Sequence, residues 1–203
     1  MIGNASDAKL IRDYYIASTN WTRGGELAPY CCADCEESLE RQGFNRAEEQ
    51  ARIDALPVRP VMPDGWTRIG SGAYRVAFLS PDGVIYKVEH SYNGVSWGQS
   101  NRGEYENILR MIRQNVRHDF CRLPKSTYFQ LDGRGVMAME YIDGERPDMW
   151  QCGYRCNCTK LTGECNTPVI DSIEIAFGIT DMHAGNIAWV PAQRTYVLLD
   201  CGA

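Results

Sequence analysis

The chain has 203 residues, of which 44% are hydrophobic, and its 21 basic and 26 acidic residues give a net charge of −5. This composition is that of a globular chain that buries a core, so intrinsic disorder is not expected, and the acidic balance makes nucleic acid a poor candidate partner. No apolar run approaches the roughly 20 residues of a membrane span, and the N-terminus lacks a basic-then-apolar signal pattern, so we expect a cytoplasmic protein with no membrane partner.

The first 60 residues have few strand signals. Residues 9–18 and 38–56 are rich in helix-forming residues, and their apolar residues recur every three or four positions. Prolines between residues 57 and 63 then mark a change of composition, which is typical of a linker. The pattern predicts a helical N-terminal extension over residues 1–60.

Short strands and turns dominate the next part of the chain. Glycines 70 and 72 and the turn Pro81-Asp82-Gly83 separate three apolar runs, and a later turn separates two more. A helical period through Tyr105, Ile108 and Ile112 lies between them. The predicted order is β-β-β-α-β-β, over residues 66–72, 74–80, 84–88, 101–114, 125–131 and 135–142.

The last part of the chain combines an apolar helix candidate over residues 169–177 with polar groups at suggestive spacing. Asp181 is followed five residues later by Asn186, and a strand, a turn and a second apolar run lead to Asp200. Two carboxylates and an amide, on a loop and at the end of a neighbouring strand, suit a divalent metal bound to a nucleotide.

Residues 65–203 resemble the protein-kinase-like superfamily. Four residues are similar to the start of its glycine-rich loop, where missing side chains let the backbone approach phosphate oxygens: Gly70, Ser71, Gly72 and Ala73. The third glycine of the family is absent, and Arg75 lies near that position.

The resemblance continues through the strand over residues 84–88, which is similar to the VAIK segment of the family. It implies that Lys87 contacts the phosphates of ATP and is held by a carboxylate on the following helix. That acid is Glu104 or Glu106. We prefer Glu104, because it opens the helix and leaves Ile108 on a neighbouring face.

The segment around Met139 resembles the fifth strand of the family as it enters the hinge between the lobes. The resemblance implies that Met139 lies beside the adenine base. It also implies that the backbone of about Glu140 to Ile142 bonds to the base.

The catalytic loop carries the strongest resemblance. Asp181 to Asn186, with His183 between them, is similar to the DxHxxN loop of aminoglycoside phosphotransferases and choline kinases. By this resemblance Asp181 orients or deprotonates the acceptor hydroxyl, whereas Asn186 and Asp200 bind Mg²⁺. His183 either takes part in the chemistry or bonds to loop backbone. Cys201 replaces the phenylalanine of the family's DFG segment.

Two groups of cysteines form a separate pattern. Because no export signal is present, metal ligation or free thiols are expected rather than disulfides. Four thiolates within a segment of little apolar content would suit structural Zn²⁺, and a second cluster could supply further ligands. The first group is Cys152, Cys156, Cys158 and Cys165, and the second is Cys31, Cys32 and Cys35. Reduced, partly buried thiols are the alternative.

We therefore expect an α+β protein with a protein-kinase-like bilobal fold. Its parts are the helical extension (1–60), a five-stranded antiparallel N-lobe with the hinge (61–143), and a truncated helical C-lobe (144–203) with a cysteine-rich insert (152–165). Minimal chains of this type resemble kinase-like proteins of bacteriophages and bacteria.

The resemblance implies transfer of the γ-phosphate of ATP, with Mg²⁺, to a protein Ser/Thr hydroxyl. One alternative is a small-molecule hydroxyl acceptor, which the DxHxxN loop favours. The other is a pseudokinase that acts as an interaction module.

Overall fold

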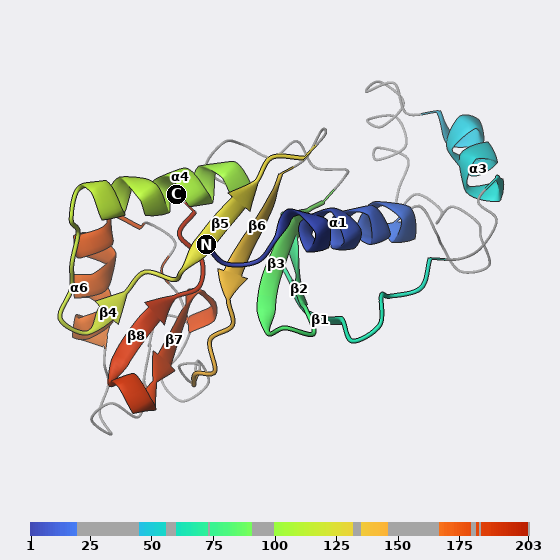
Figure 1. Ribbon diagram of the computed structural model, residues 1–203. Coiled ribbons are helices and arrows are strands. Elements are labelled where there is room, and N and C mark those ends of the chain that lie inside the picture. The colour runs from blue at the N-terminus through green and yellow to red at the C-terminus, as the bar shows by residue number, and fades with distance from the viewer. Residues whose placement is uncertain are drawn as a thin grey trace.

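The computed structural model describes residues 1–19, 45–55, 60–72, 74–90, 100–131, 135–145, 167–179, 182 and 184–202. Five antiparallel strands form the larger sheet of this part of the chain (Figure 1). In spatial order they are β1 (Thr67–Ser71), β2 (Arg75–Leu79), β3 (Val84–Glu89), β6 (Val136–Glu140) and β5 (Ser126–Phe129). These are the five predicted strands, and the predicted α+β class with a five-stranded antiparallel sheet is confirmed. No helix in the described part of the chain has both the length and the hydrophobicity of a bilayer span.

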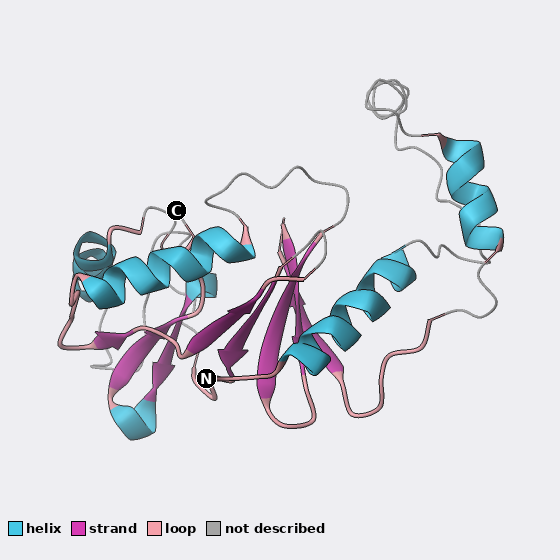
Figure 2. Ribbon diagram, turned by 45° about the horizontal axis from the view of Figure 1, so that its top comes forward, coloured by secondary structure: helices cyan, strands magenta, loops and turns pink. Residues whose placement is uncertain are grey.

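Alternation along the strands sends side chains to two different hydrophobic cores. On β2, Val76 and Phe78 belong to the core beneath helix α1 (Ala5–Thr19). Ala77 on the same strand packs against the other core, which includes Met111 of helix α4 (Asn101–Arg113). The sheet therefore lies between two helices, with α1 on one face and α4 on the other (Figures 1 and 2).

The helix predicted as part of an extension covers one face of the sheet. Ala8, Ile11 and Tyr15 of α1 are buried against β2, β3 and β6. The Tyr15 hydroxyl hydrogen-bonds to Nδ1 of His90, and Nε2 of His90 lies 3.0 Å from the Gly72 carbonyl oxygen, to which it donates. The chain of bonds connects α1 to the turn between β1 and β2.

The first residues of the chain are also held on the sheet. The backbone N–H of Ile2 donates to Oγ1 of Thr127 at 3.0 Å. Gly3 has a φ of +69°, and a Cβ at this position would lie 2.7 Å from Cβ of Ala138 and 2.8 Å from the hydroxyl oxygen of Tyr86. Only glycine satisfies both the backbone angle and the close approach.

Helix α4 has a clear beginning and end. The Ser100 hydroxyl accepts the backbone N–H of Gly103 at 2.9 Å, which satisfies one of the free donors at the helix start. Asn115, with a φ of 51°, ends the helix in the left-handed conformation. Ile108 and Met111 are buried, whereas Arg110 and Arg113 near the end favour the negative pole of the helix. The predicted range of this helix is confirmed to within one residue.

A second, smaller sheet lies beside the first. Its strands are β4 (Cys121–Arg122), β8 (Thr195–Leu198) and β7 (Ile187–Val190), with β4 parallel to β8. The β7–β8 hairpin was predicted, but β4 was not, because two residues carry no measurable alternation. Gly144 brings the segment after β6 against β7, since a Cβ there would lie 2.8 Å from the Trp189 carbonyl oxygen.

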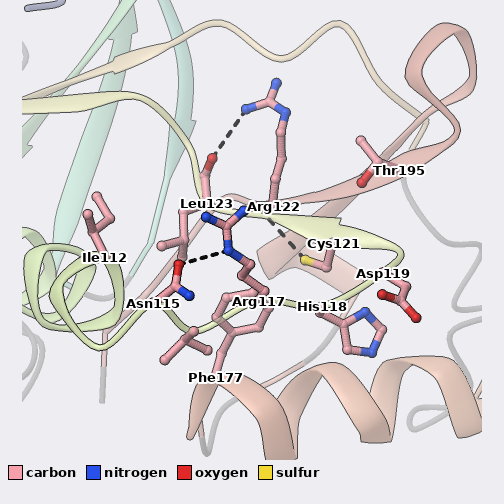
Figure 3. Close-up of a pocket in the computed structure, with 11 residues that line it drawn as sticks. Ile112, Asn115, Arg117, His118, Asp119, Cys121, Arg122, Leu123, Phe177 and Thr195 are labelled. Carbon is pink, nitrogen blue, oxygen red and sulfur yellow. Dashed lines mark hydrogen bonds between the residues drawn. The ribbon is translucent and has the colours of Figure 1, made fainter.

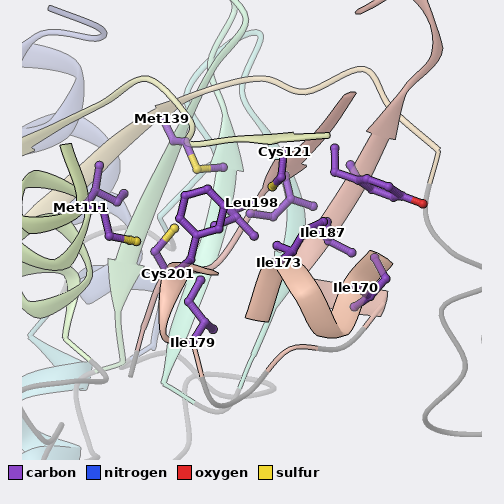
Figure 4. Close-up of a cluster of buried hydrophobic side chains, with 14 of the residues drawn as sticks. Met111, Cys121, Met139, Ile170, Ile173, Ile179, Ile187, Leu198 and Cys201 are labelled. Atoms are coloured by element: carbon purple, nitrogen blue, oxygen red, sulfur yellow. The ribbon is translucent and has the colours of Figure 1, made fainter. Parts of the chain in front are cut away.

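One hydrophobic core connects the two sheets with α4 and with helix α6 (Thr167–Phe177). Ile170, Ile173 and Phe177 of α6 are buried in it. Cys201 is fully buried in the same core, and Figure 4 shows it among Met111, Met139 and Ile179. The remaining described elements are helix α3 (Arg46–Asp54) and two 3₁₀ turns, η3 (Ala184–Asn186) and η4 (Pro191–Gln193).

Candidate active site

Lys87 lies in the middle of β3, on the face of the sheet that α4 covers. Its Nζ donates to Oε1 of Glu104 at 2.7 Å and to the carbonyl oxygen of Leu199 at 2.7 Å. The residue is only 8% exposed. A lysine this buried needs acceptors around its ammonium group. One acceptor comes from α4 and the other from the segment that follows β8.

Glu104 is the acceptor that connects these segments. It is fully buried in the first turn of α4 and accepts hydrogen bonds from Lys87, from the Arg75 guanidinium and from the backbone N–H of Cys201 at 3.2 Å. Glu106, the other acid considered from the sequence, forms a surface pair with Arg102 at 2.8 Å. The structure therefore pairs Lys87 with Glu104.

Asp200 follows β8 and lies next to this cluster. Its Oδ2 accepts a hydrogen bond from the Arg75 guanidinium at 2.6 Å, and its Oδ1 accepts the backbone N–H of Gly202 at 2.9 Å. Burial alone would raise the pKa of Asp200, but the positive charges of Lys87 and Arg75 outweigh it, so its pKa lies below the ordinary value. Asp200 is therefore a carboxylate at neutral pH.

Arg75 is a site residue that sequence reasoning did not assign to the site. It is the first residue of β2, and alternation places it on the same face as Ala77, where Lys87 also points. Burial would lower the pKa of Arg75, but Glu104 and Asp200 raise it above the ordinary value, so the guanidinium stays charged. The signal was present in the sequence, because an arginine here replaces the third glycine of the loop it resembles.

The β7–β8 hairpin brings Asn186 and Asp200 to the same end of the small sheet. Ile187 is in register with Leu198, so Asn186 directly precedes the first pair and Asp200 lies two residues beyond it. The backbone N–H of Leu199 donates to the carbonyl oxygen of Asn186 at 2.8 Å. A carboxylate and an amide oxygen are hard oxygen ligands of the kind that Mg²⁺ prefers.

The predicted glycine loop forms the turn between β1 and β2. Gly70 and Ser71 end β1, and the backbone N–H of Gly72 donates to the Arg75 carbonyl oxygen at 2.8 Å. All three are exposed, and no described atom lies within 4 Å of where a Cβ on Gly70 would be. Packing does not explain a glycine at position 70. Ala73 lies outside the described residues.

The predicted hinge residues, which lie at the end of β6 and just after it, are in different environments. Met139 is buried in the core with its side chain toward α4. The Glu140 carboxylate accepts hydrogen bonds from the Arg122 guanidinium at 2.5 Å and from the backbone N–H of Lys125 at 2.7 Å. Ile142 is partly buried against the same core. The carboxylate of Glu140 is thus engaged, and its backbone N–H donates to the Lys125 carbonyl oxygen at 3.0 Å.

Several predicted site residues lie outside the described part of the chain. They are Asp181, His183 and the seven candidate zinc ligands: Cys31, Cys32, Cys35, Cys152, Cys156, Cys158 and Cys165. The described residues contain no group of three or more side chains that could hold a metal ion among themselves. Two cysteines that are described, Cys121 and Cys201, are free and buried, and burial raises the pKa of the Cys121 thiol to about 12.

A cavity of about 540 Å³ lies between the end of α4, β4 and α6 (Figure 3). It is lined by His118 and Cys121 among others and shares no residue with the Lys87 cluster. Beside it, Nε2 of His118 lies 2.8 Å from the Ser172 hydroxyl. Nδ1 of His118 accepts the backbone N–H of Phe120, so the neutral ring carries its proton on Nε2. In this arrangement His118 is not a base for Ser172.

Comparisons with known proteins found no matching protein-family model and no curated protein similar in sequence. Among solved structures, the streptomycin–ATP ternary complex of APH(2")-IIa is 20% identical over 59% of this chain and 31% of that chain, with a TM-score of 0.29. The gentamicin complex of the same protein is 21% identical over the same shares, with a TM-score of 0.31. Rad53 1-466 in complex with AMP-PNP is 11% identical over 78% of this chain and 43% of that chain, with a TM-score of 0.36.

The chain thus spans 31% to 43% of the length of these proteins. The features that agree with the predicted kinase-like fold come from the structure of the chain itself. They are the strand order β1-β2-β3-β6-β5, the helix between β3 and β5, and the buried pair of Lys87 and Glu104 beside Asp200.

Proposed function

We propose that the chain is an ATP-dependent phosphotransferase whose nucleotide binds between the β1–β2 turn, Lys87 and Asp200. The observation that supports this most is the buried pair of Lys87 and Glu104, 2.7 Å apart, with Asp200 joined to the same cluster through Arg75. Burying several charges in one place costs free energy, and such clusters concentrate at functional sites. Gly70, Ser71 and Gly72 of the β1–β2 turn are exposed, so their backbone is accessible to a ligand.

The chemistry follows from charge. ATP carries several negative charges, which Lys87 and the backbone N–H groups of the β1–β2 turn would offset. Asp200 and Asn186 would hold Mg²⁺, and a bound Mg²⁺ would supply further positive charge to the phosphates. In the resemblance on which this proposal draws, Asp181 orients the acceptor hydroxyl.

For the acceptor, we propose a Ser/Thr hydroxyl on a protein. A hydroxyl on a small molecule is the alternative, because the DxHxxN pattern of residues 181–186 resembles the loop of small-molecule kinases. A third possibility is that the site binds a nucleotide without transferring its phosphate.

The test is phosphate transfer from labelled ATP with Mg²⁺. We expect Lys87→Met and Asp200→Asn to lower the rate about 100-fold or more, because each removes a charge aimed at the phosphates or the metal. Arg102→Gln, which breaks an exposed pair on α4, is the matched control and should transfer at the wild-type rate. A wild-type rate no higher than that of the two site variants would sink the enzyme proposal.

The acceptor is resolved by running the same assay with three additions. The chain alone tests transfer to itself, a protein extract tests protein acceptors, and a set of aminoglycosides and amino alcohols tests small molecules. Label that appears only on a small molecule would replace the protein-kinase proposal with the alternative. Nucleotide binding without label on any acceptor would favour the interaction module.

We also propose that the cysteine clusters bind structural Zn²⁺. The support is the spacing of Cys152, Cys156, Cys158 and Cys165 in the sequence. Elemental analysis of protein purified without a metal-binding tag should find one or two zinc ions per chain. A folded sample free of zinc would overturn this proposal and favour reduced thiols.

A further inference from the structure

The Arg75 guanidinium occupies a position between two carboxylates of the proposed active site. It hydrogen-bonds to Oε2 of Glu104 and, at 2.6 Å, to Oδ2 of Asp200. The exposed fractions of these side chains are 13% for Arg75, none for Glu104 and 31% for Asp200. Of the three, Asp200 is the one that solvent and ligands reach.

The charges of the cluster already balance. Lys87 and Arg75 carry two positive charges, and Glu104 and Asp200 carry two negative charges. A divalent ion bound by Asp200 would lie next to the Arg75 guanidinium. Two cations bound to one carboxylate repel each other strongly in a partly buried site. Arg75 and the metal cannot both be held well by the same carboxylate.

The oxygen atoms of Asp200 lead to the same conclusion. Oδ1 accepts the backbone N–H of Gly202 at 2.9 Å, and Oδ2 accepts the Arg75 guanidinium. A metal ion bound through Oδ2 would have to share that oxygen with the guanidinium, so coordination by both oxygens of the carboxylate requires the arginine to leave. Arg75 is the first residue of β2, at the end of the strand next to the turn where Gly72 is exposed.

We propose that Arg75 competes with the metal of the incoming nucleotide for Asp200. Arg75 holds Asp200 while the site is empty of metal, and loading the site requires this ion pair to open. The affinity for metal is therefore set in part by Arg75. This inference rests on the proposed function, because it assigns the metal to Asp200.

The test measures Mn²⁺ binding by electron paramagnetic resonance, with Mn²⁺ as a probe for Mg²⁺, in the absence of nucleotide and with a non-hydrolysable ATP analogue. We expect Arg75→Gln to bind Mn²⁺ about tenfold more tightly than wild type, which corresponds to about 1.4 kcal/mol of lost competition. Asp200→Asn and the double variant should lose this gain. Arg102→Gln should behave like wild type, because it removes an arginine from an ion pair on α4 without touching Asp200.

The outcomes separate the inference from the function beneath it. If Arg75→Gln binds Mn²⁺ no more tightly than wild type while Asp200→Asn weakens binding, the inference is wrong and the metal site stands. If Asp200→Asn leaves metal and nucleotide binding unchanged, the proposed site is wrong and the inference falls with it. Thermal unfolding checks that each variant is folded.

A second variant keeps the inference testable if Arg75→Gln does not fold. Arg75→Lys retains the positive charge but loses the planar fork that can bond to two carboxylates at once. We expect it to fold and to bind Mn²⁺ more tightly than wild type, by less than tenfold. Unchanged or weaker binding in this folded variant would overturn the inference.

Discussion

The buried carboxylate of Glu104 accepts hydrogen bonds from three segments of the chain. It accepts from Lys87 of β3, from Arg75 of β2 and from the backbone of Cys201 after β8. From the sequence, Glu104 and Glu106 both remained candidates for the pair with Lys87, because spacing alone does not show which side of a helix meets a sheet. Burial separates them, since Glu104 is inaccessible and Glu106 lies on the surface with Arg102.

The two acids give a matched pair of substitutions. We expect Glu104→Gln to lower the free energy of unfolding by about 3–5 kcal/mol, because two buried cations lose their counter-charge. Glu106→Gln breaks only an exposed pair and should change it by about 0.5 kcal/mol or less. Urea denaturation of both variants checks this. Equal effects would contradict the central position of Glu104.

Asp200 should make the stability depend on pH. Its pKa is lowered in the folded chain, so it stabilises the fold at pH values above its unfolded pKa, and this stabilisation is lost as the pH falls through the folded pKa. We expect the stability difference between wild type and Asp200→Asn to shrink below about pH 4, the ordinary range of an aspartate. Denaturation curves from pH 6 to pH 3 measure this. A difference that does not change with pH would contradict it.

At the scale of elements, the sequence predicted the strands and α4 well and the packing of α1 poorly. The five strands and α4 have strong local signals, namely turns at Gly83 and near residue 133, and the helical period of residues 101–114. Helical spacing in residues 9–18 indicates an apolar face but does not say what that face covers. A hint was available, because β6 is apolar on both faces over residues 136–139, and such a strand needs cover on both sides.

Two neighbouring residues of α1 test this packing. Ile11 is fully buried against the sheet, and Leu10 is 46% exposed. We expect Ile11→Ala to lower the free energy of unfolding by about 2–5 kcal/mol, because it leaves a cavity in the core. Leu10→Ala should cost about 0.5 kcal/mol or less. Similar values for both would show that α1 is not part of the fold's core.

At the scale of the whole molecule, the described residues form two hydrophobic cores that share the five-stranded sheet. One core lies between the sheet and α1, and the other joins the sheet to α4, α6 and the small sheet. The second core also positions the site, because Cys201 is buried in it next to Asp200. Local sequence patterns predicted the strands, α4 and the pair of Lys87 and Glu104. They did not predict the contacts of Arg75 and α1, which arise only when distant segments meet.

Deletion of residues 1–19 examines the molecule at this scale. We expect it to abolish cooperative unfolding and to lower nucleotide binding, because Val76, Phe78, Tyr86 and Val88 lose their cover, although Lys87, Glu104 and Asp200 all remain. Size-exclusion chromatography measures whether the deletion variant stays monomeric, and near-ultraviolet circular dichroism measures whether it keeps its tertiary packing and unfolds cooperatively. A monomeric, folded deletion variant would show that α1 is dispensable.

The anchoring of the first residues on the sheet also bears on the order of folding. The hydrogen bond from Ile2 to Thr127 spans 125 positions, and the contact of Gly3 with Ala138 spans a similar distance along the chain. During synthesis, α1 leaves the ribosome long before β5 and β6 exist, so its apolar face must wait for them. Docking of α1 on the sheet is therefore a late event, and contacts between residues so far apart in the sequence slow folding.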